Sequence, residues 1–361
     1  MTVHANLHAS FDPARAEAFA GRLMTALNDA ALVVMTSIGH RTGLFDAMAE
    51  MPPSTLDDIA ARTELAKRYV REWLAVMVTG GVATYDPRAG TYRLPAEHAA
   101  FLTRTATPDN MAVTAQMIPS MGAVEDAVVE RFRTGEGLSY DAYPRFHEVM
   151  AEDSGQTVVA ALFDRILPLV SGLAERLEDG IDVLDVGCGA GRAMVRLAGH
   201  FPNSRFLGLD LSEQAVGMGR RAAEEEGLSN VRFEACDLST RSTFGAYDLV
   251  TAFDAVHDQK DPQGLLDAVA RSLKPGGVFL MQDIAGSSRL ERNLDHPLAP
   301  LLYAVSCLHC TPVSLAQGGP GLGTMWGEEL ATDMLGRAGF SKVTAQRLPH
   351  DPFNVYFVAR R

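Results

Sequence analysis

The chain has 361 residues, of which 47% are hydrophobic and 21% charged, and its formal net charge is −13. This length exceeds the usual size of one domain, so we expect two domains with separate cores. The acidic balance opposes broad electrostatic attraction to nucleic acid or to an anionic membrane, and no apolar run approaches the roughly 20 residues of a membrane span.

Four cysteines, two of them within apolar or glycine-rich segments, do not form a disulfide framework. The amino terminus, MTVHANLHAS, lacks the charged and apolar regions of a signal peptide. We therefore expect a soluble protein of the reducing cytoplasm.

The first hundred residues are predicted to be mostly helical. Asp12 before Pro13 is a helix start, and apolar residues at helical spacing continue to about residue 38 as a stripe that needs a partner. A capping-box-like start at Thr55 opens a second helix. After a turn at residues 63–65 a third helix follows, ended by Gly80 and Gly81, and a hairpin with DPRAG at its tip comes next.

Helix, turn, helix and a two-stranded wing is the element order of a winged helix, a fold that DNA-binding regulators share. The third helix carries Lys67, Arg68 and Arg71, but Glu72 and neighbouring acidic residues leave no basic face. We therefore interpret these charges as a solvated helix face rather than a DNA-reading surface.

Residues 108–177 are predicted to be helical without strands, with breaks at residues 135–144 and 153–155. Apolar residues recur along them: Met111, Met117, Met121, Met150 and Phe163. Such stripes are usually core, although methionine also suits a pocket that wraps an apolar ligand. We predict a linker that contributes pocket wall.

Strands and helices alternate in the second half, which predicts a parallel sheet with crossover helices. The first strand leads through Asp185 to Gly187, Gly189 and Gly191, which let the backbone turn sharply and approach a ligand. The dinucleotide fingerprint needs glycine at its first, third and sixth places, whereas Arg192 fills the sixth place here. This spacing counts against NAD.

Two later strands also end in acids. Asp210 closes the strand at residues 205–210, where a carboxylate can accept hydrogen bonds from both ribose hydroxyls, or can instead cap the helix that starts near Ser212. Asp237 follows the strand at residues 231–235 and could instead cap a turn. A fourth strand, residues 247–253, precedes DAVHD, and LKPGG is the predicted turn before a fifth strand, GVFLMQD. Residues 340–360 are predicted to form a closing antiparallel hairpin.

VLDVGCGAG resembles motif I of the class I S-adenosylmethionine (SAM) dependent methyltransferases, and the two acids and LKPGG extend this resemblance over residues 179–361. Residues 31–102 resemble the amino-terminal domain of plant-type and related bacterial small-molecule O-methyltransferases. The resemblance implies an α/β fold with a Rossmann-like seven-stranded class I methyltransferase sheet and a mostly helical winged-helix domain. It also implies SAM as cofactor and methyl transfer to a small hydrophobic acceptor, at a hydroxyl oxygen.

This resemblance defines the expected domains. We predict a winged-helix dimerisation domain at residues 1–105, a helical linker at 106–177 and a SAM-binding domain at 178–361, with an acceptor-side insertion at 285–327. The expected assembly is a homodimer without nucleic-acid or membrane partners. By resemblance, the glycine turn receives the methionine end of SAM, and Asp237 takes the adenine amine between apolar neighbours. The predicted cofactor-binding residues are Asp185, Gly187, Cys188, Gly189, Gly191, Asp210, Leu211, Cys236, Asp237, Leu238, Phe253 and Asp254.

VHDQKD is similar to the HDWSD-type segment of plant-type O-methyltransferases, whose histidine is the general base; Gln259 and Lys260 replace its Trp and Ser. A phenol with a pKa near 10 needs such a base at neutral pH. The candidate catalytic residues are therefore His257 as the base and Asp258, with Asp254 or Asp258 as its orienting partner. The alternative role of His257 is packing or capping beside the cofactor.

The insertion is predicted to contain an apolar helix from residue 298 to about 310, stopped before Pro312, and then a glycine-rich lid, GGPGLGTMW. Cys307, His309 and Cys310 suggest a metal site. However, C-x-x-C occurs once here, without a second pair at zinc-finger spacing, and buried thiols usually act as small hydrophobes. We therefore expect no metal.

Two other functions compete with methyl transfer. One is a winged-helix regulator that uses SAM as effector, which would need a basic reading surface. The other is a methyltransferase-fold enzyme that catalyses a non-methylating step such as a cyclisation, which nothing in the sequence opposes. An NAD-dependent dehydrogenase is disfavoured by the glycine spacing.

Overall fold

The structure, a computed structural model, describes residues 11–361, which form two compact units. Unit 1 comprises the described residues up to Ala106 together with Asn110–Ile118, and unit 2 comprises Thr107–Asp109 and Pro119–Arg361. The helical segment that follows Pro119 thus lies in the same unit as the strands of the second half.

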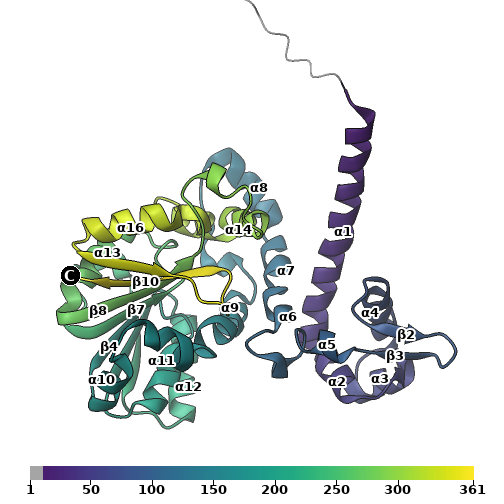
Figure 1. Cartoon of the computed structure of the whole chain (residues 1–361), viewed down its shortest axis with the longest axis horizontal. Coiled ribbons are helices and arrows are strands. Elements are labelled where there is room, and N and C mark those ends of the chain that lie inside the picture. The colour runs from purple at the N-terminus through teal and green to yellow at the C-terminus, as the bar shows by residue number, and fades with distance from the viewer. Residues whose placement is uncertain (1–10) are drawn as a thin grey trace, which may run out of the picture. The chain divides into compact units, whose positions relative to one another are not determined.

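Unit 1 consists mainly of helices (Figure 1). Its elements are α1 (Pro13–Thr42), α2 (Leu44–Glu50), β1 (Ser54–Thr55), α3 (Leu56–Thr63), α4 (Lys67–Thr79), β2 (Thr84–Asp86), β3 (Thr91–Arg93), α5 (Ala96–Ala99), η1 (Arg104–Ala106) and α6 (Met111–Thr114). The predicted helix, turn, helix and wing are confirmed, with α3 and α4 as the helices and β2 and β3 as the wing. The very short β1 was not predicted, and it pairs with β3 in the sheet order β1-β3-β2.

Local signals in the sequence fix the helix ends of unit 1. Asp12 caps α1 by accepting from two backbone N–H groups, and Thr55 and Asp58 form a capping box at the start of α3. Trp73 of α4 is buried, contacts the edge of the Phe45 ring and donates to the carbonyl of Met35. These contacts join α1, α2 and α4 around one apolar core.

Helix α1 is longer than predicted, because it continues past residue 38 to Thr42 and ends at Gly43 in the left-handed region. Its amino-terminal turns expose large apolar side chains: Phe19, Leu23, Met24 and Leu27 are 50–66% exposed. Two helical stretches, Pro13–Thr42 and Ala299–Ala316, pass a length and composition test for a membrane span, contrary to our expectation that no run approaches that length. Core helices of soluble proteins pass the same test, so it does not identify a membrane protein.

Unit 2 begins with helices and then alternates strands and helices (Figure 1). Its helices are α7 (Met117–Gly122, which starts in unit 1), α8 (Glu125–Thr134), η2 (Tyr140–Ala142), α9 (Phe146–Ser154), η3 (Gly155–Val159), η4 (Leu162–Ile166), η5 (Leu167–Leu169), α10 (Leu173–Asp179), α11 (Arg192–His200), α12 (Glu213–Glu225), η6 (Leu238–Thr240), α13 (Pro262–Ser272), η7 (Leu290–Arg292), α14 (Ala299–Val305), η8 (Ser306–Cys310), α15 (Thr311–Ala316), η9 (Thr324–Trp326) and α16 (Gly327–Arg337). Its strands are β4 (Asp182–Val186), β5 (Arg205–Asp210), β6 (Val231–Ala235), β7 (Tyr247–Phe253), β8 (Leu273–Ile284), β9 (Lys342–Gln346) and β10 (Asn354–Arg360).

The seven strands form one sheet in the order β6-β5-β4-β7-β8-β10-β9. Strands β4 to β8 pair in parallel, whereas β10 is antiparallel to both β8 and β9. The predicted closing hairpin is therefore confirmed, with β10 inserted between β8 and the edge strand β9. The strand order reverses between β4 and β7, and ligands of open α/β sheets bind beside such a point at the carboxyl ends of the strands.

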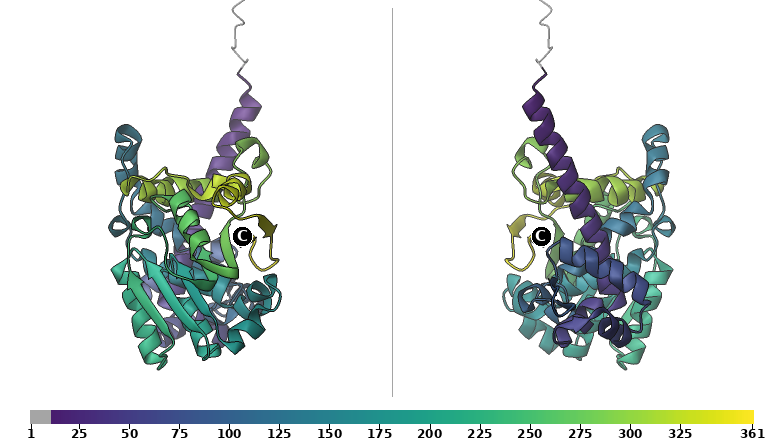
Figure 2. Two further views of the ribbon diagram at one scale, coloured as in Figure 1. Left: turned by 90° about the vertical axis from the view of Figure 1, so that its left-hand side faces the viewer. Right: turned by 90° about the vertical axis from the view of Figure 1, so that its right-hand side faces the viewer.

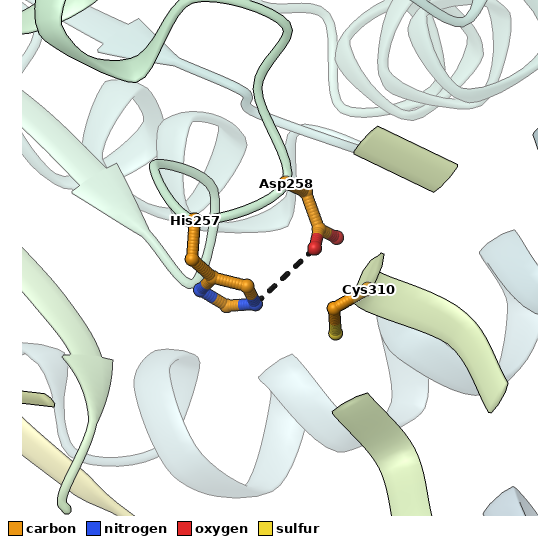
Figure 3. Close-up of side chains that lie close together, drawn as sticks. All are labelled: His257, Asp258 and Cys310. Atoms are coloured by element: carbon orange, nitrogen blue, oxygen red, sulfur yellow. Dashed lines mark ion pairs between the residues drawn. The ribbon is translucent and has the colours of Figure 1, made fainter. Parts of the chain in front are cut away.

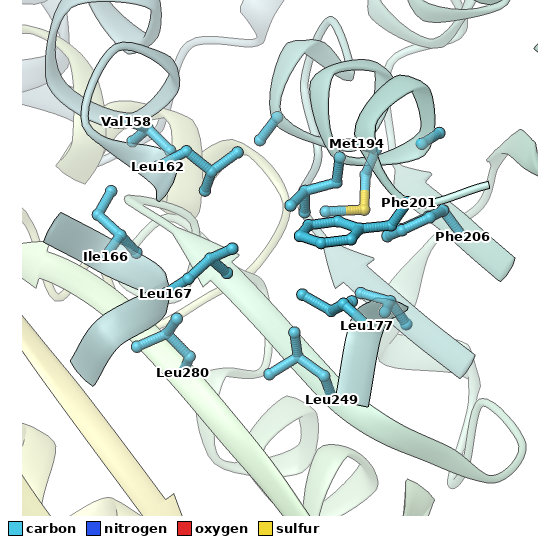
Figure 4. Close-up of a cluster of buried hydrophobic side chains, with 14 of the residues drawn as sticks. Val158, Leu162, Ile166, Leu167, Leu177, Met194, Phe201, Phe206, Leu249 and Leu280 are labelled. Carbon is cyan, nitrogen blue, oxygen red and sulfur yellow. The ribbon is translucent and has the colours of Figure 1, made fainter. Parts of the chain in front are cut away.

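Helices cover both faces of this sheet (Figure 2), and each face has its own core because successive residues of a strand point to opposite sides. On β4, Val183 packs with α10, α11 and α12, whereas Leu184 packs with α13 and α16. Residues of the helical segment 158–170 complete the first core (Figure 4). The predicted fold class is confirmed: an α/β unit with a Rossmann-like seven-stranded sheet follows a mostly helical winged-helix unit.

Three local predictions were wrong. The LKPGG segment belongs to β8, where a register shift against β7 accommodates it, instead of forming a separate turn. The expected break at residues 153–155 is a change from α9 into the π-helix η3, so the chain stays helical. The helix of the insertion does not stop before Pro312, because the π-helix η8 is followed directly by α15.

The continuation past Pro312 depends on a contact with Tyr143. Proline lacks an N–H, so the carbonyl four residues earlier, that of Leu308, loses its usual helical donor. The hydroxyl of Tyr143 donates to this carbonyl at 2.8 Å instead. A distant side chain thus replaces the missing backbone hydrogen bond and supports the helix through the proline.

Candidate active site

The glycine turn after β4 has the geometry that its sequence predicts. Gly187, Gly189 and Gly191 all have positive φ, at 73°, 53° and 70°. A Cβ atom on Gly187 would lie 2.3 Å from the Cβ of Ala255, and one on Gly191 would lie 2.3 Å from the ring of Phe233. A Cβ on Gly189 would meet nothing within 4 Å, so the middle glycine borders open space.

Asp210, at the end of β5, holds this turn in place. Its Oδ2 accepts from the backbone N–H of Gly189 and its Oδ1 from that of Ser212, each at 2.8 Å. Burial raises the pKa of Asp210, and these two hydrogen bonds act in the opposite direction. Each carboxylate oxygen can accept a further hydrogen bond, so ribose hydroxyls could still bind here.

Asp185 lies deeper in the sheet than the sequence suggested. It is 2% exposed and accepts a 2.7 Å hydrogen bond from the hydroxyl of Thr251 on β7. Burial raises the pKa of Asp185 to about 7, with a smaller contribution from the charge of Asp210. Asp185 therefore supports the turn from within the sheet. Cys188 is half-buried, and its N–H, like that of Gly187, donates to the carbonyl of Leu209.

The predicted adenine-side residues follow β5 and β6. Asp237 accepts from the backbone N–H and hydroxyl of Ser239 at 2.9 and 2.6 Å, so its alternative role as a turn cap is present in the structure. The N–H of Cys236 donates to the carbonyl of Asp210, Leu238 is buried and Leu211 is 46% exposed. The adenine contact of Asp237 stays a prediction.

Phe253 ends β7, and its half-buried ring packs against the first core. The next residue, Asp254, is one of three non-glycine residues with positive φ among those described, at 51°. Backbone strain of this kind is concentrated at functional sites. Its Oδ1 is buried without a hydrogen-bond partner in the described chain, and burial, followed by the charge of Asp283, raises its pKa well above the usual range.

His257 lies in the loop after β7 and is only 3% exposed. Its Nδ1 lies 2.7 Å from Oδ1 of Asp283, and its Nε2 lies 3.3 Å from Oδ1 of Asp258. Burial alone would lower the pKa of His257, but the two flanking carboxylates raise it well above the usual value. In this environment the imidazole favours its protonated form.

The orienting partner of His257 was predicted only in part. Asp258 is a neighbour, but the short contact is with Asp283, which the sequence analysis did not select, and Asp254 forms no such contact. Asp283 is itself fixed, because its Oδ1 also accepts from Nε1 of Trp326 and from the N–H of Ile284. Asp283 stands near the end of the predicted fifth strand, so the rule that selected Asp210 would have found it. Trp326, within the predicted lid, is 3% exposed.

Cys310 approaches the same place from the insertion. Its thiol, the imidazole of His257 and the carboxylate of Asp258 each offer an atom within 4.8 Å of the others (Figure 3). His309 also lies close, with Nδ1 3.6 Å from the Cys310 sulfur and 3.9 Å from Oδ2 of Asp258. Cys307 of the same C-x-x-C is exposed and does not belong to this group.

Aromatic side chains adjoin the group. The ring of Phe146 stacks on His309 with centroids 4.1 Å apart, and the ring of Tyr143 meets the same imidazole edge-on at 4.7 Å. Burial and then the charges of Asp258 and Asp210 raise the pKa of Tyr140 well above its usual value, so this phenol lies near both carboxylates. Burial also lowers the pKa of His309 to about 4, which keeps its ring neutral.

Comparison with known proteins supports this division of the chain. Residues 30–104 match the Rv2258c-like winged HTH domain, and residues 177–317 match a methyltransferase domain. The chain therefore carries a methyltransferase domain after an amino-terminal winged HTH domain. This finding confirms the family that the motifs predicted, and SAM is the cofactor of that family.

Two curated relatives are similar to part of this chain. The ubiquinone biosynthesis O-methyltransferase of Leptothrix cholodnii is 34% identical over 105 residues, 28% of this chain and 44% of that protein. The sterol 24-C-methyltransferase ERG6B of Gibberella zeae is 34% identical over 126 residues, 32% of each chain. The chain thus spans less than half the length of either relative.

Solved structures match over nearly the whole length of this chain, for example one human protein. Human N-acetylserotonin methyltransferase in complex with SAM has a TM-score of 0.68 and 18% identity, covering 98% of this chain and 99% of that one. At this identity the match describes the fold. The shared fold therefore includes the winged-helix unit as well as the sheet.

Proposed function

We propose that this protein transfers a methyl group from SAM to a small, hydrophobic acceptor, at a hydroxyl oxygen. The observation that carries the proposal is the arrangement of the glycine turn and Asp210 at the carboxyl ends of adjacent parallel strands. An O-methyltransferase among the partial relatives supports oxygen as the target atom. The three glycines at spacing two, which counted against NAD, all have the positive φ of a turn in the structure.

The residues present fit SAM. The open space beside Gly189 would admit a ligand, whereas the side of the turn at Gly187 and Gly191 is filled by protein atoms. In the proposed arrangement Asp210 binds the ribose and Asp237 the adenine amine, while the buried Asp185 keeps the turn in position. Bound SAM supplies an electrophilic methyl group, and the protein holds the acceptor in line with it.

We assign removal of the acceptor's proton to the group around His257. Asp283 holds Nδ1, so Nε2 is the ring atom left to act on an acceptor. A base must be neutral, and the two carboxylates that flank His257 favour its charged form. Direct base catalysis by His257 therefore requires a pH above its raised pKa, and turnover should rise into the alkaline range.

The aromatic residues beside this group support a planar, apolar acceptor. Tyr140, Tyr143 and Phe146 are all close to His309, and Tyr140 lies near both Asp210 and Asp258. Aromatic side chains contact flat apolar ligands through their faces and edges. We therefore propose a phenol or a related aromatic hydroxyl compound as the acceptor class.

We further propose that the protein is a cytoplasmic homodimer. The exposed apolar side chains of α1 would be buried against a second copy of this helix and unit, at about 25 cal/mol per Å² of apolar surface. All four cysteines are free, as in a reducing compartment. Leu23→Glu with Leu27→Glu should convert the dimer to a monomer in analytical ultracentrifugation, and a wild-type monomer at micromolar concentration would contradict the proposal.

Calorimetry followed by a product assay tests the central proposal. The wild-type protein should bind S-adenosylhomocysteine. The Asp210→Asn and Asp237→Asn variants should each bind it more weakly and remain folded. The protein is then incubated with SAM and a panel of phenols, and acceptor mass is measured. A gain of one methyl group with matching release of S-adenosylhomocysteine supports the proposal. Lack of binding to either cofactor form would refute it, and a product without added methyl mass would refute methyl transfer alone.

A further inference from the structure

Three buried side chains with metal-binding atoms converge beside the proposed acceptor position. His257, Asp258 and Cys310 are 3%, 8% and 4% exposed, and one ligand atom from each lies within 4.8 Å of the others (Figure 3). They come from the loop after β7 and from the π-helix η8, 52 residues later in the chain. Imidazole, carboxylate and thiolate are the three ligand types that zinc sites use.

The contact between His257 and Asp258 is not an ordinary hydrogen bond. Nε2 and Oδ1 are 3.3 Å apart, yet Oδ1 is buried without a hydrogen-bond partner in the described part of the chain. Ligands of one tetrahedral zinc ion at bond lengths of about 2.0–2.1 Å are separated by about 3.3 Å. The two atoms form an ion pair when the imidazole is protonated, and the same spacing fits a shared ion when the imidazole is neutral.

The other nitrogen of His257 is held as it is in metal sites. Nδ1 lies 2.7 Å from Asp283, and this carboxylate is fixed in turn by Trp326 and by a backbone N–H. A metal-ligating histidine commonly donates its second N–H to a carboxylate, which sets the tautomer and aims the free nitrogen at the ion. The contact leaves Nε2 as the donor atom toward Asp258 and Cys310.

Charge balance favours a cation at this place. The carboxylates of Asp258 and Asp283 both lie beside His257, and His309 is the other imidazole close to Asp258 among the described residues. Buried carboxylates in a region of low dielectric need a compensating positive charge. A divalent ion would compensate that charge.

We propose that His257, Asp258 and Cys310 bind one divalent transition-metal ion, Zn²⁺ by preference. The mixture of nitrogen, oxygen and sulfur ligands suits zinc better than magnesium or calcium, which prefer oxygen alone. This proposal departs from our expectation of no metal, which considered Cys307, His309 and Cys310 together; the present set replaces Cys307 and His309 with His257 and Asp258. Three protein ligands leave a coordination position for water or for an oxygen of the acceptor.

The assignment changes how the acceptor loses its proton, a step that rests on the proposed methyl transfer. A hydroxyl bound to zinc would have a lowered pKa, so it would lose its proton to solvent water near neutral pH, without a neutral His257 as direct base. The open coordination position would exchange its water for the oxygen of the acceptor. Metal binding itself does not depend on SAM or on methyl transfer, and it is measured without either.

Titration with Co²⁺ and Zn²⁺ tests the proposal. The full-length protein, treated with chelator and then freed of it, is titrated with Co²⁺, and the absorption spectrum is recorded. We expect one ion per chain, with a thiolate-to-cobalt charge-transfer band and tetrahedral d–d bands, which Zn²⁺ displaces. Elemental analysis of the Zn²⁺-loaded, desalted protein should give one zinc per chain.

Matched cysteine variants identify the ligand. Cys310→Ser should lose the charge-transfer band and bind Zn²⁺ roughly 100-fold more weakly, whereas Cys307→Ser, three residues away and exposed, should behave as wild type. Asp283→Asn should weaken binding roughly 10-fold to 100-fold and retain the band, because it removes an orienting contact and no ligand. Circular dichroism confirms that each variant is folded.

Two results would overturn the proposal. One is the lack of stoichiometric Co²⁺ or Zn²⁺ binding at micromolar protein in the folded wild type. The other is equal loss of the charge-transfer band in Cys307→Ser and Cys310→Ser, which would place the ion elsewhere. If metal binds as expected but no phenol gains a methyl group, the proposed function fails and the metal site stands.

Discussion

Replacing Asp185 with Asn should make the stability of unit 2 less dependent on pH. The side chain is fully enclosed at the end of β4, and burial raises its pKa from 3.8 to about 7. The folded chain therefore binds this proton more tightly than the unfolded chain does. The Asp185 contribution is fully present below about pH 4 and is lost as the pH rises through about 7.

The size of the effect follows from that shift. Each pKa unit corresponds to about 1.4 kcal/mol, so moving from 3.8 to about 7 costs the wild type about 4 kcal/mol of unfolding free energy at and above neutral pH. Between pH 5 and pH 7 the loss is about 2 kcal/mol, because part of the effect is already present at pH 5. Asparagine has no charge to desolvate, and its amide oxygen can accept the same hydrogen bond from Thr251.

The two tryptophans make the assay selective. Trp73 lies in α4 of unit 1 and Trp326 in η9 of unit 2, and the chain contains no others. In a Trp73→Phe background, fluorescence during urea unfolding therefore reports unit 2 alone. The difference in unfolding free energy between Asp185→Asn and its parent is measured from pH 5 to pH 9 without ligand. The unfolding free energy of the variant should exceed that of its parent by an amount that grows up to about pH 7 and then stays nearly constant.

Asp248 is the control, because its shift has the opposite sign. Although burial raises its pKa, the ammonium group of Lys274, 2.7 Å away, lowers the pKa overall. Asp248→Asn should therefore be less stable than its parent by a constant amount from pH 5 to pH 9, because this carboxyl titrates below about pH 4 in both the folded and the unfolded chain. A constant offset for Asp185→Asn across the whole range would refute the reasoning, since a lost contact alone has no pH dependence.

Three further substitutions test other parts of the structure. Gly191→Ala should weaken binding of S-adenosylhomocysteine about 100-fold in calorimetry, because its Cβ would lie 2.3 Å from Phe233 at a φ of 70°; unchanged affinity would contradict the geometry of the turn. Tyr143→Phe should lower the unfolding free energy by about 1 kcal/mol in urea titrations, because the Leu308 carbonyl loses its donor, and an unaltered midpoint would count against that contact. With a phenolic acceptor, turnover should rise with pH if His257 is the direct base, and His257→Gln should abolish that rise; the same profile in both proteins would remove the base assignment.

Much of the fold could be predicted because its signals are local. The strands at residues 205–210, 231–235 and 247–253 were predicted with the bounds that the structure has, since each is a short apolar run between turn residues. The sequence also indicated that Asp210 lies beside the glycine turn, and it does, because parallel strands bring their carboxyl ends to the same edge of a sheet.

The acceptor side was predicted less well because its contacts are not local. Asp283 meets His257 across two adjacent strand ends, and 26 residues separate them in the sequence. Trp326 looked like part of a flexible glycine-rich lid, but its indole is buried against Asp283. Nothing in the spacing of GGPGLGTMW indicates that a tryptophan anchors its end, because an indole N–H finds its partner only in the folded chain.

Cys310 shows most clearly how one irregular turn decides which residues meet. In a regular α-helix from residue 299 onwards, each side chain would advance by about 100°, and Pro312 would end the helix. The π-helix η8 inserts extra backbone into one turn, so every residue after it faces a different direction from the one that helical periodicity predicts. Tyr143 satisfies the carbonyl that Pro312 leaves free, which allows the helix to continue and keeps Cys310 within reach of His257 and Asp258. The same irregularity therefore explains both the wrong prediction of a helix end and the convergence of the proposed metal ligands.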